Sequence, residues 1–297
     1  MTESIVLALG GGGVKGIAHL GIVACLLENH YSIEGIAGTS AGGMFGAPLA
    51  AQVPPREILD RCIEFMKKPD FRRVPKDTAS LVGTRGLEIA LAPFLEGKVI
   101  DDLPIKFCVT AVSLKTGEEV VISEGDVMQA VLSTIAIPGV FPTRGEDVLV
   151  DGGVMDPVPI KPARALNPSL SIVAVTLHTK PADSNTEQTN LSMTGQIADT
   201  IIDRVTKTRI GESLDIMNKG VGLGSDRLTE LSIEVGKPDV LVRPLVGQFS
   251  SLQKVDPTEL YDEGYRAMES QLPALVESLT LLNSIKRIAK YSNANPK

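Results

Sequence analysis

The sequence predicts an α/β protein with a mainly parallel sheet, and two observations within residues 1–52 carry this prediction. A short, continuously apolar segment at 5–9 is typical of a strand that is buried on both faces of a sheet, and a second short apolar segment follows at 33–37. Each segment runs into a glycine-rich turn and then into residues with helical spacing or helix-compatible composition. An alternation of strand, turn and helix indicates parallel strands joined by helical crossovers.

The elements that follow are predicted from the same patterns. Apolar residues at helical intervals predict helices from Pro54 onward, at 83–95, 127–136, 191–218 and 257–290. Period-two and continuous apolar segments predict strands at 105–114, 119–122, 148–150, 170–177 and 240–246. The first two of these strands form a hairpin through Lys115-Thr-Gly117, and the polar residues 180–190 form a surface loop.

Composition and charge exclude several classes of function. The chain has 297 residues, a net charge of −7 and a pI of about 5.2, whereas a nucleic-acid-binding protein normally carries a basic surplus. The three cysteines and three histidines show no metal-like spacing, so we expect neither a metal nor a cofactor.

One basic, partly apolar segment, 67–76, is interpreted either as a solvated loop or as a transient contact with a membrane surface.

The amino-terminal segment gives an expectation about location. It has no basic region, its apolar segment is too short for a secretory signal, and no apolar stretch reaches the length of a membrane span. We therefore expect a cytoplasmic protein that is at most peripheral to a membrane.

The first of three chemical motifs is Gly38-Thr39-Ser40-Ala41-Gly42, which has the form G-x-S-x-G. A serine on a tight turn between a strand and a helix projects its hydroxyl out of the sheet. The flanking glycines permit a close backbone approach, and the helix amino terminus stabilises negative charge beside the nucleophile. An ordinary strand-to-helix turn is the alternative.

The second motif is the glycine loop, Gly10 to Gly16, which contains G-x-G-x-x-G at Gly11, Gly13 and Gly16. This pattern also occurs in dinucleotide-binding folds, which require an acidic residue at the end of the second strand. Here that strand ends in the serine motif, and Glu34 lies at its other end. We therefore favour an oxyanion hole built from consecutive backbone N–H groups over a nucleotide site.

The third motif is Asp151-Gly152-Gly153, at the end of a short apolar strand. Asp-Gly is common in turns, but a serine nucleophile needs a base. The order Ser40, Asp151, His178 formally matches the triad of an α/β-hydrolase, although that fold places several strands before its serine. A buried aspartate with a raised pKa can serve as the base without histidine, and we rank this reading first.

These motifs resemble, in order and spacing, those of the patatin-like phospholipases. A glycine loop with a basic residue before its last glycine, a G-x-S-x-G motif and a D-G-[GA] motif are all present. Between the last two, residues 133–142 are similar to the family stretch S-x-x-A-x-P-x-x-F-x-P, with the final proline, Pro142, one position earlier than in that pattern. The resemblance covers roughly residues 4–180, and residues beyond 190 match no motif.

The resemblance implies a role for each matching residue. Ser40 would be the nucleophile, Asp151 the general base, and Gly11, Gly12 and Gly13 the oxyanion hole. Lys15 stands where the family commonly has arginine, which keeps the charge but not the planar fork. The remaining motif positions, which would support the backbone geometry, are Gly16, Gly38, Gly42, Gly152 and Gly153.

The resemblance also implies a three-layer α/β/α sandwich with a mainly parallel central sheet, extra helices at the carboxyl terminus, and hydrolysis of lipid esters. We expect one domain over 1–297, with a catalytic core at about 4–180 and a helical extension at about 190–290. The expected partner is a lipid or acyl-ester substrate, with no nucleic acid. The alternatives are the triad esterase and a catalytically silent ligand-binding domain.

Overall fold

The computed structural model describes residues 3–75, 77–78, 80–178, 209–249 and 255–280. The predicted loop at 180–190 and the predicted helical residues 191–208 and 281–290 lie outside this range.

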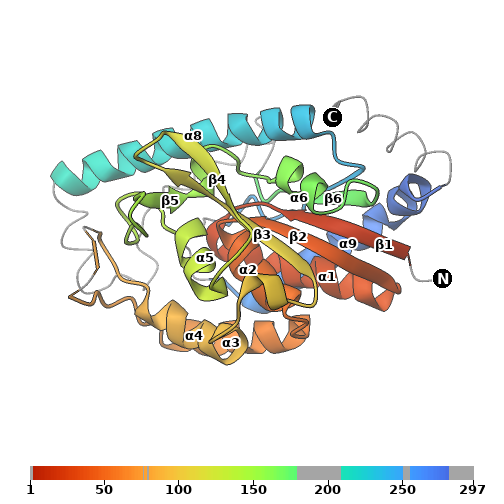
Figure 1. Ribbon diagram of the computed structural model, residues 1–297, viewed down its shortest axis with the longest axis horizontal. Helices are drawn as coiled ribbons and strands as arrows, with labels where there is room; N and C mark the ends of the chain where they lie inside the picture. The colour runs from red at the N-terminus through yellow and green to blue at the C-terminus, as the bar shows by residue number, and fades with distance from the viewer. Residues whose placement is uncertain (1–2, 76, 79, 179–208, 250–254, 281–297) are drawn as a thin grey trace.

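The described strands form one seven-stranded sheet with the order β4-β3-β2-β1-β6-β7, and β5 pairs with β3 (Figure 1). All contacts among β1, β2, β3, β6 and β7 are parallel, whereas β4 and β5 both run antiparallel to β3. The mainly parallel sheet and the predicted hairpin are thus confirmed. The strands are β1 (Glu3–Leu9), β2 (Tyr31–Thr39), β3 (Lys106–Ser113), β4 (Glu118–Ile122), β5 (Leu149–Asp151), β6 (Ser171–Val175) and β7 (Val240–Val242).

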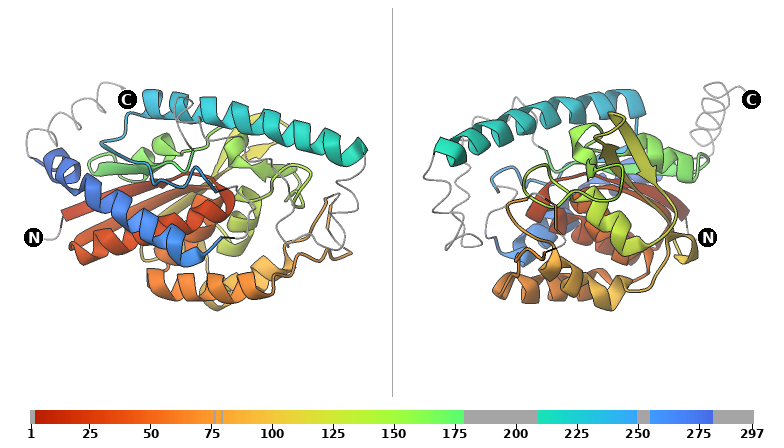
Figure 2. Two further views of the ribbon diagram at one scale, coloured as in Figure 1. Left: turned by 180° about the vertical axis from the view of Figure 1, so that it is seen from behind. Right: turned by 60° about the vertical axis from the view of Figure 1, so that its left-hand side comes forward.

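Helices cover both faces of this sheet, which gives the predicted three layers (Figure 2). One face packs against α1 (Ala18–Glu28), α2 (Ala41–Ala50), α5 (Val127–Thr134) and α9 (Pro257–Ser278), and α3 (Pro55–Lys67) and α4 (Arg85–Leu95) pack on the outside of these helices. The other face packs against α6 (Ile160–Leu166) and α8 (Arg209–Gly236). The alternation of side chains along a strand divides the core accordingly: Leu7 and Leu9 contact the first group, and Val6 and Ala8 the second.

The segments beyond residue 190 complete this core. Strand β7 extends the sheet beside β6, and the buried side chains of Leu260, Met268 and Leu275 bring α9 into the larger core cluster. Helix α9 crosses α1 closely, because a methyl group at Gly21 would lie 1.9 Å from the carbonyl oxygen of Tyr261 (Figure 2).

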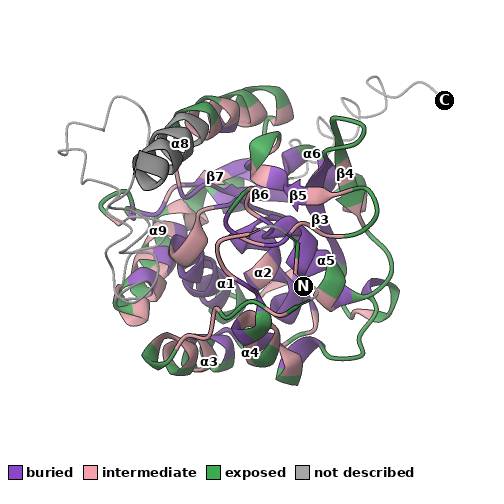
Figure 3. Cartoon of the chain, turned by 90° about the vertical axis from the view of Figure 1, so that its left-hand side faces the viewer, coloured by how far each residue is buried: buried purple, intermediate pink, exposed green. Residues whose placement is uncertain are grey.

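Helix α8 differs from its prediction, since it continues to Gly236 rather than ending at 218. The sequence around Gly220, Gly222 and Gly224 has low helical propensity, so the pattern indicated an end there. Packing overrides that propensity: Thr229 is fully buried, and Ile233 contacts the smaller core cluster. Between residues 223 and 236, the outer face of the same helix is exposed (Figure 3).

Within the described residues, no helix combines the length and apolar character needed to cross a bilayer.

Candidate active site

Strands β2 and β5 meet end to end on one edge of β3. Residues 109–113 of β3 pair with β4, so β2 and β5 must share the opposite edge. There Thr39 of β2 pairs with Thr110, and Asp151 of β5 pairs with the next residue, Ala111. Because β2 and β5 run in opposite directions, their carboxyl ends face each other. This brings Ser40, which follows Thr39, next to Asp151.

Ser40 forms the turn between β2 and α2 in a left-handed backbone conformation, with φ of 53°. Such angles are costly for a residue other than glycine and require support from the surroundings. The turn is also tight, because a methyl group at Gly42 would lie 1.9 Å from the carbonyl oxygen of Leu9. Gly38 similarly packs against the backbone of Gly43. The sequence motif is therefore a strained strand-to-helix elbow.

The elbow is supported by Thr134, at the end of α5. The backbone N–H of Ser40 donates a hydrogen bond to the Thr134 hydroxyl oxygen at 2.8 Å. Nearby, a hydrogen bond 2.7 Å long joins the hydroxyl groups of Thr39 and Thr110. Both pairs are buried, so each hydroxyl satisfies a polar group that water does not reach.

The Asp151 carboxyl is buried beside the Ser40 hydroxyl, and the two residues are 5% and 9% exposed. Burial disfavours the charged form and raises the pKa of Asp151 to about 6, while hydrogen bonding from Ser40 and from the Gly153 amide opposes the rise. The Gly153 N–H lies 2.8 Å from Asp151 Oδ1. Gly152 lies against Thr110, where a methyl group would approach its hydroxyl oxygen to 2.2 Å. Asp151 is thus a carboxylate near neutral pH with an elevated proton affinity.

The glycine loop lies beside Ser40, but its amides differ in their bonding. The Gly11 N–H donates to the carbonyl oxygen of Pro157 at 3.0 Å and is therefore already engaged. The amides of Gly12 and Gly13 donate to no group within the described part of the chain. Of the three amides that the sequence analysis expects in an oxyanion hole, that of Gly11 is thus engaged by the tertiary contact with Pro157.

Two buried side chains hold the glycine loop in place. Lys15 Nζ donates to the carbonyl oxygen of Leu177 at 3.0 Å, and burial lowers the pKa of Lys15 while Asp226 raises it. His19 Nε2 donates to the carbonyl oxygen of Gly10 at 2.9 Å, and burial lowers the pKa of His19 to about 4. Both groups point into the protein and brace the backbone of the loop. Gly16 allows this packing, because a methyl group there would contact the side chains of Ala41 and Phe45.

His178 does not lie between Ser40 and Asp151. Its Nδ1 is 2.7 Å from Oδ1 of Asp226, on helix α8. In a Ser–His–Asp triad the same ring nitrogen would contact the catalytic aspartate. The structure therefore gives His178 a different carboxylate partner from the one that the triad interpretation requires.

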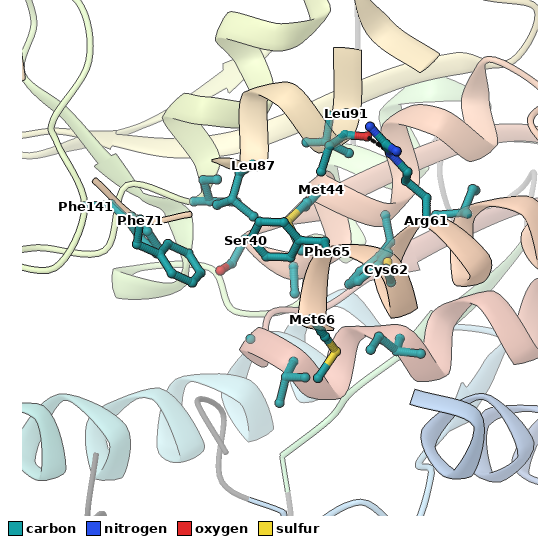
Figure 4. Close-up of a pocket in the computed structure, with 18 of the residues that line it drawn as sticks. Ser40, Met44, Arg61, Cys62, Phe65, Met66, Phe71, Leu87, Leu91 and Phe141 are labelled. Atoms are coloured by element: carbon teal, nitrogen blue, oxygen red, sulfur yellow. Dashed lines mark hydrogen bonds between the residues drawn. The ribbon is translucent and has the colours of Figure 1, made fainter. Parts of the chain in front are cut away.

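An apolar pocket opens at Ser40 and extends between α2, α3 and α4 (Figure 4). Phe65, Phe71 and Phe141 form an aromatic wall, with ring centroids 5.6 and 6.2 Å apart along the row. Cys62 also lines the pocket, and burial raises the pKa of its thiol to about 12, so the thiol is neutral. The other lining residues include Val14, Ile17, Met44, Phe45, Ile58, Met66, Leu87, Leu91, Phe94, Ile135 and Ile137.

Glu34 lies away from the carboxyl end of β2, where a nucleotide site would need its acidic residue. Its side chain is exposed and accepts a hydrogen bond from Ser4. Over the described residues, His, Cys, Asp and Glu side chains form no group of three or more that would hold a metal ion.

Sequence reasoning missed three groups of the site: the Thr134 support, the Pro157 acceptor and the aromatic wall. Thr134 and Phe141 fall within the motif at 133–142, whose resemblance was noted without a role for either residue. Phe71 belongs to the basic segment and shows no motif signal.

The fold and the site together define an α/β protein with a serine on a strand-to-helix elbow that faces a buried aspartate. The family model for patatin-like phospholipases matches residues 7–164, slightly more than half of the chain. The protein therefore belongs to the patatin-like phospholipase family.

The chain is also similar to individual proteins of this kind. It is 33% identical over 182 residues to an uncharacterized NTE family protein of Mycobacterium bovis, which covers 59% of this chain and 49% of that protein. It is 30% identical over 169 residues to the lysophospholipase NTE1 of Cryptococcus neoformans, covering 54% of this chain and 10% of that protein. The chain thus spans half or less of the length of these relatives. Among solved structures, VipD from Legionella pneumophila matches with a TM-score of 0.47 and 15% identity, over 92% of this chain and 67% of that chain.

Proposed function

We propose that the protein is a serine acyl hydrolase that cleaves lipid carboxylic esters, with Ser40 as nucleophile and Asp151 as base. The observation that carries the proposal is the end-to-end meeting of β2 and β5, by which the Ser40 hydroxyl faces a buried carboxyl whose pKa is raised to about 6. Such a carboxylate is still ionised at neutral pH, yet it accepts a proton more readily than an ordinary aspartate.

The reaction proceeds through an acyl-enzyme. Asp151 takes the hydroxyl proton as Ser40 Oγ attacks the ester carbonyl carbon, and the resulting oxyanion accepts hydrogen bonds from the amides of Gly12 and Gly13. Collapse of this tetrahedral intermediate breaks the ester bond, and Asp151 returns the proton to the departing alcohol. Water then attacks the acyl-enzyme while Asp151 takes its proton. The fatty acid leaves, and Ser40 recovers its hydrogen.

The lipid character of the substrate is supported by the pocket. Its lining is apolar apart from Ser40 and Arg61, and the aromatic wall begins beside the nucleophile (Figure 4). An acyl chain in this pocket removes apolar surface from water while its carbonyl carbon lies at Ser40. The similarity to a lysophospholipase agrees with this assignment.

The test is hydrolysis of p-nitrophenyl esters of graded chain length by wild type, Ser40→Ala and Asp151→Asn. We expect both substitutions to abolish turnover, and a fluorophosphonate probe to label wild type but not Ser40→Ala, because an unactivated serine is inert. Folding of each variant is checked by circular dichroism. Turnover retained by Ser40→Ala would refute the assignment. A wild type that neither turns over nor reacts with the probe would favour the silent ligand-binding domain.

We further propose that the basic segment contacts an anionic membrane surface near the pocket. Lys67, Lys68 and Arg73 are exposed, whereas Arg72 is paired with Asp70 through two nitrogens. Phe71, between these charges, belongs to the pocket wall. Wild type should bind vesicles with anionic lipid more tightly than vesicles without it. A Lys67→Gln/Lys68→Gln/Arg73→Gln variant should lose this difference, whereas Lys115→Gln should keep it. Unchanged binding by the triple variant would leave the segment a solvated loop.

A further inference from the structure

Helix α4 contains a proline that leaves one of its backbone carbonyls without its helical partner. Pro93 lies inside α4 and has no N–H, so it cannot donate to the carbonyl oxygen of Ile89, four residues earlier. A freed carbonyl of this kind takes a partner from a side chain, from a neighbouring helix or from water.

Arg61 of helix α3 supplies that partner. Its Nη2 donates to the carbonyl oxygen of Ile89 at 3.2 Å, and its Nε donates to the carbonyl oxygen of Ala90 at 3.1 Å. The third nitrogen, Nη1, lies 3.1 Å from Glu64 Oε2 on the same helix as Arg61. All three guanidinium nitrogens are thus engaged, and the side chain is only 35% exposed. Arg61 joins α3 to α4 through a fixed fork rather than a flexible charge.

The Arg61 contact between α3 and α4 lies at the far end of the pocket from the nucleophile. Arg61 lines the pocket, and Figure 4 shows its side chain on the opposite side of the cavity from Ser40 and Phe141. Its neighbours in the lining come from α3 and α4, among them Ile58, Leu91 and Phe94. Separation of the two helices would therefore extend the pocket at the end that a long acyl chain reaches.

We propose that Arg61, acting on the carbonyl freed by Pro93, is a positioning residue that sets the upper limit of acyl-chain length. The inference rests on the proposed hydrolase function, since the pocket must hold an acyl chain for its depth to matter. A rigid apolar pocket discriminates between chains by roughly 10- to 200-fold for one methylene, so a change in its far end alters the ratio between chain lengths.

The experiment measures kcat/KM for p-nitrophenyl esters from short to long chains with wild type, Arg61→Met, Pro93→Ala and the double variant. The apolar methionine side chain can still line the pocket, but it donates no hydrogen bond. We expect Arg61→Met to raise the ratio of long-chain to medium-chain kcat/KM. Pro93→Ala restores a backbone N–H that competes with Arg61 for the carbonyl oxygen of Ile89. This change should therefore weaken the contact between α3 and α4 and shift the ratio in the same direction. Because both changes act on one contact, the double variant should shift it no further than Arg61→Met.

The matched control is Arg56→Met, the same substitution on the same helix, at a side chain outside the pocket that pairs with Asp60. It should leave the chain-length profile unchanged. Binding of free fatty acids of graded length, followed by the shift in Tm, gives the same comparison without turnover. If Arg61→Met fails to fold, Arg61→Lys and Pro93→Ala carry the test, because Pro93 is exposed and alanine favours a helix.

The outcomes separate the inference from the function on which it rests. If an active Arg61→Met enzyme shows kcat/KM values that are unchanged, or that are lowered equally for all chain lengths, the inference about Arg61 is overturned but the proposed function is not. A wild type that cleaves no ester and binds no fatty acid would overturn the proposed function as well.

Discussion

The backbone nitrogen of Ser40 lies 2.8 Å from the hydroxyl oxygen of Thr134, and this bond joins the elbow at Ser40 to the end of helix α5. The two residues are 94 positions apart in the sequence. Thr134 is fully buried, so no water replaces its hydroxyl if the side chain is changed. The strained conformation of Ser40 therefore depends on a distant residue.

Replacing Thr134 by valine should weaken the elbow. Valine has a similar shape but leaves the Ser40 N–H unpaired, which costs about 1–3 kcal/mol. We expect a lower free energy of unfolding and a lower kcat, measured by denaturant unfolding and ester hydrolysis. Thr134→Ser keeps the hydroxyl and should retain both. Equal activity in the valine and serine variants would contradict the supporting role.

Replacing Gly12 by alanine should lower kcat with less effect on KM. The added methyl group would lie 2.8 Å from Cδ1 and 2.9 Å from Cβ of Leu177, so the loop must move and its amides move with it. Loss of one oxyanion donor typically lowers kcat about 10²–10³-fold. Gly224→Ala is the control, because a methyl group there meets nothing within 4 Å and should leave hydrolysis intact. An unchanged rate in Gly12→Ala would remove the loop from the mechanism.

The dependence of kcat/KM on pH should show an acidic limb near pH 6. In the proposed mechanism the carboxylate of Asp151 is the active form, so the rate should fall as the pH drops through its pKa of about 6 rather than through the ordinary value of 3.8. Asp156, whose pKa burial raises to about 7, is the other candidate for such a limb. Asp156→Asn should keep the limb in place. A limb that disappears in this variant would assign the titration to Asp156.

The same pKa has a consequence for stability. Because the pKa of Asp151 is higher in the folded protein than in the unfolded chain, its contribution to stability is complete below pH 3.8 and is lost as the pH rises through about 6. Asp151→Asn removes the buried charge and should be more stable than wild type above pH 6, by up to about 3 kcal/mol. Denaturant unfolding across this range measures the difference, which should vanish toward pH 4. A difference in unfolding free energy that does not change with pH would show that burial of the Asp151 charge does not destabilise the fold.

Replacing His178 by alanine should affect the attachment of α8 more than catalysis. The bond from His178 to Asp226 links the end of β6 to that helix, and its loss should cost about 1 kcal/mol because Asp226 is partly exposed. Ester hydrolysis should remain far above that of Asp151→Asn. Asp226→Asn is the matched change on the other side of the bond. Inactivation of His178→Ala to the level of Asp151→Asn would restore the triad interpretation.

The local elements and the motif positions follow from the sequence alone. Short apolar segments at 5–9 and 33–37 predict buried parallel strands, and the glycines around Ser40 predict a tight elbow, because these features depend on residues close together in the chain. The length of α8 does not follow, since burial of Thr229 and packing of Ile233 outweigh the low helical propensity of the glycines at 220–224.

What only the tertiary structure decides is which groups meet. Ser40 and Asp151 face each other because β2 and β5 share one edge of β3, an arrangement that requires residues far apart in the sequence to pair. The same long-range packing engages the Gly11 amide with Pro157, turns His178 toward Asp226 and joins Arg61 to the carbonyl freed by Pro93. Sequence patterns report propensity and burial along the chain, whereas hydrogen-bond partners depend on positions in space that only the packed layers define.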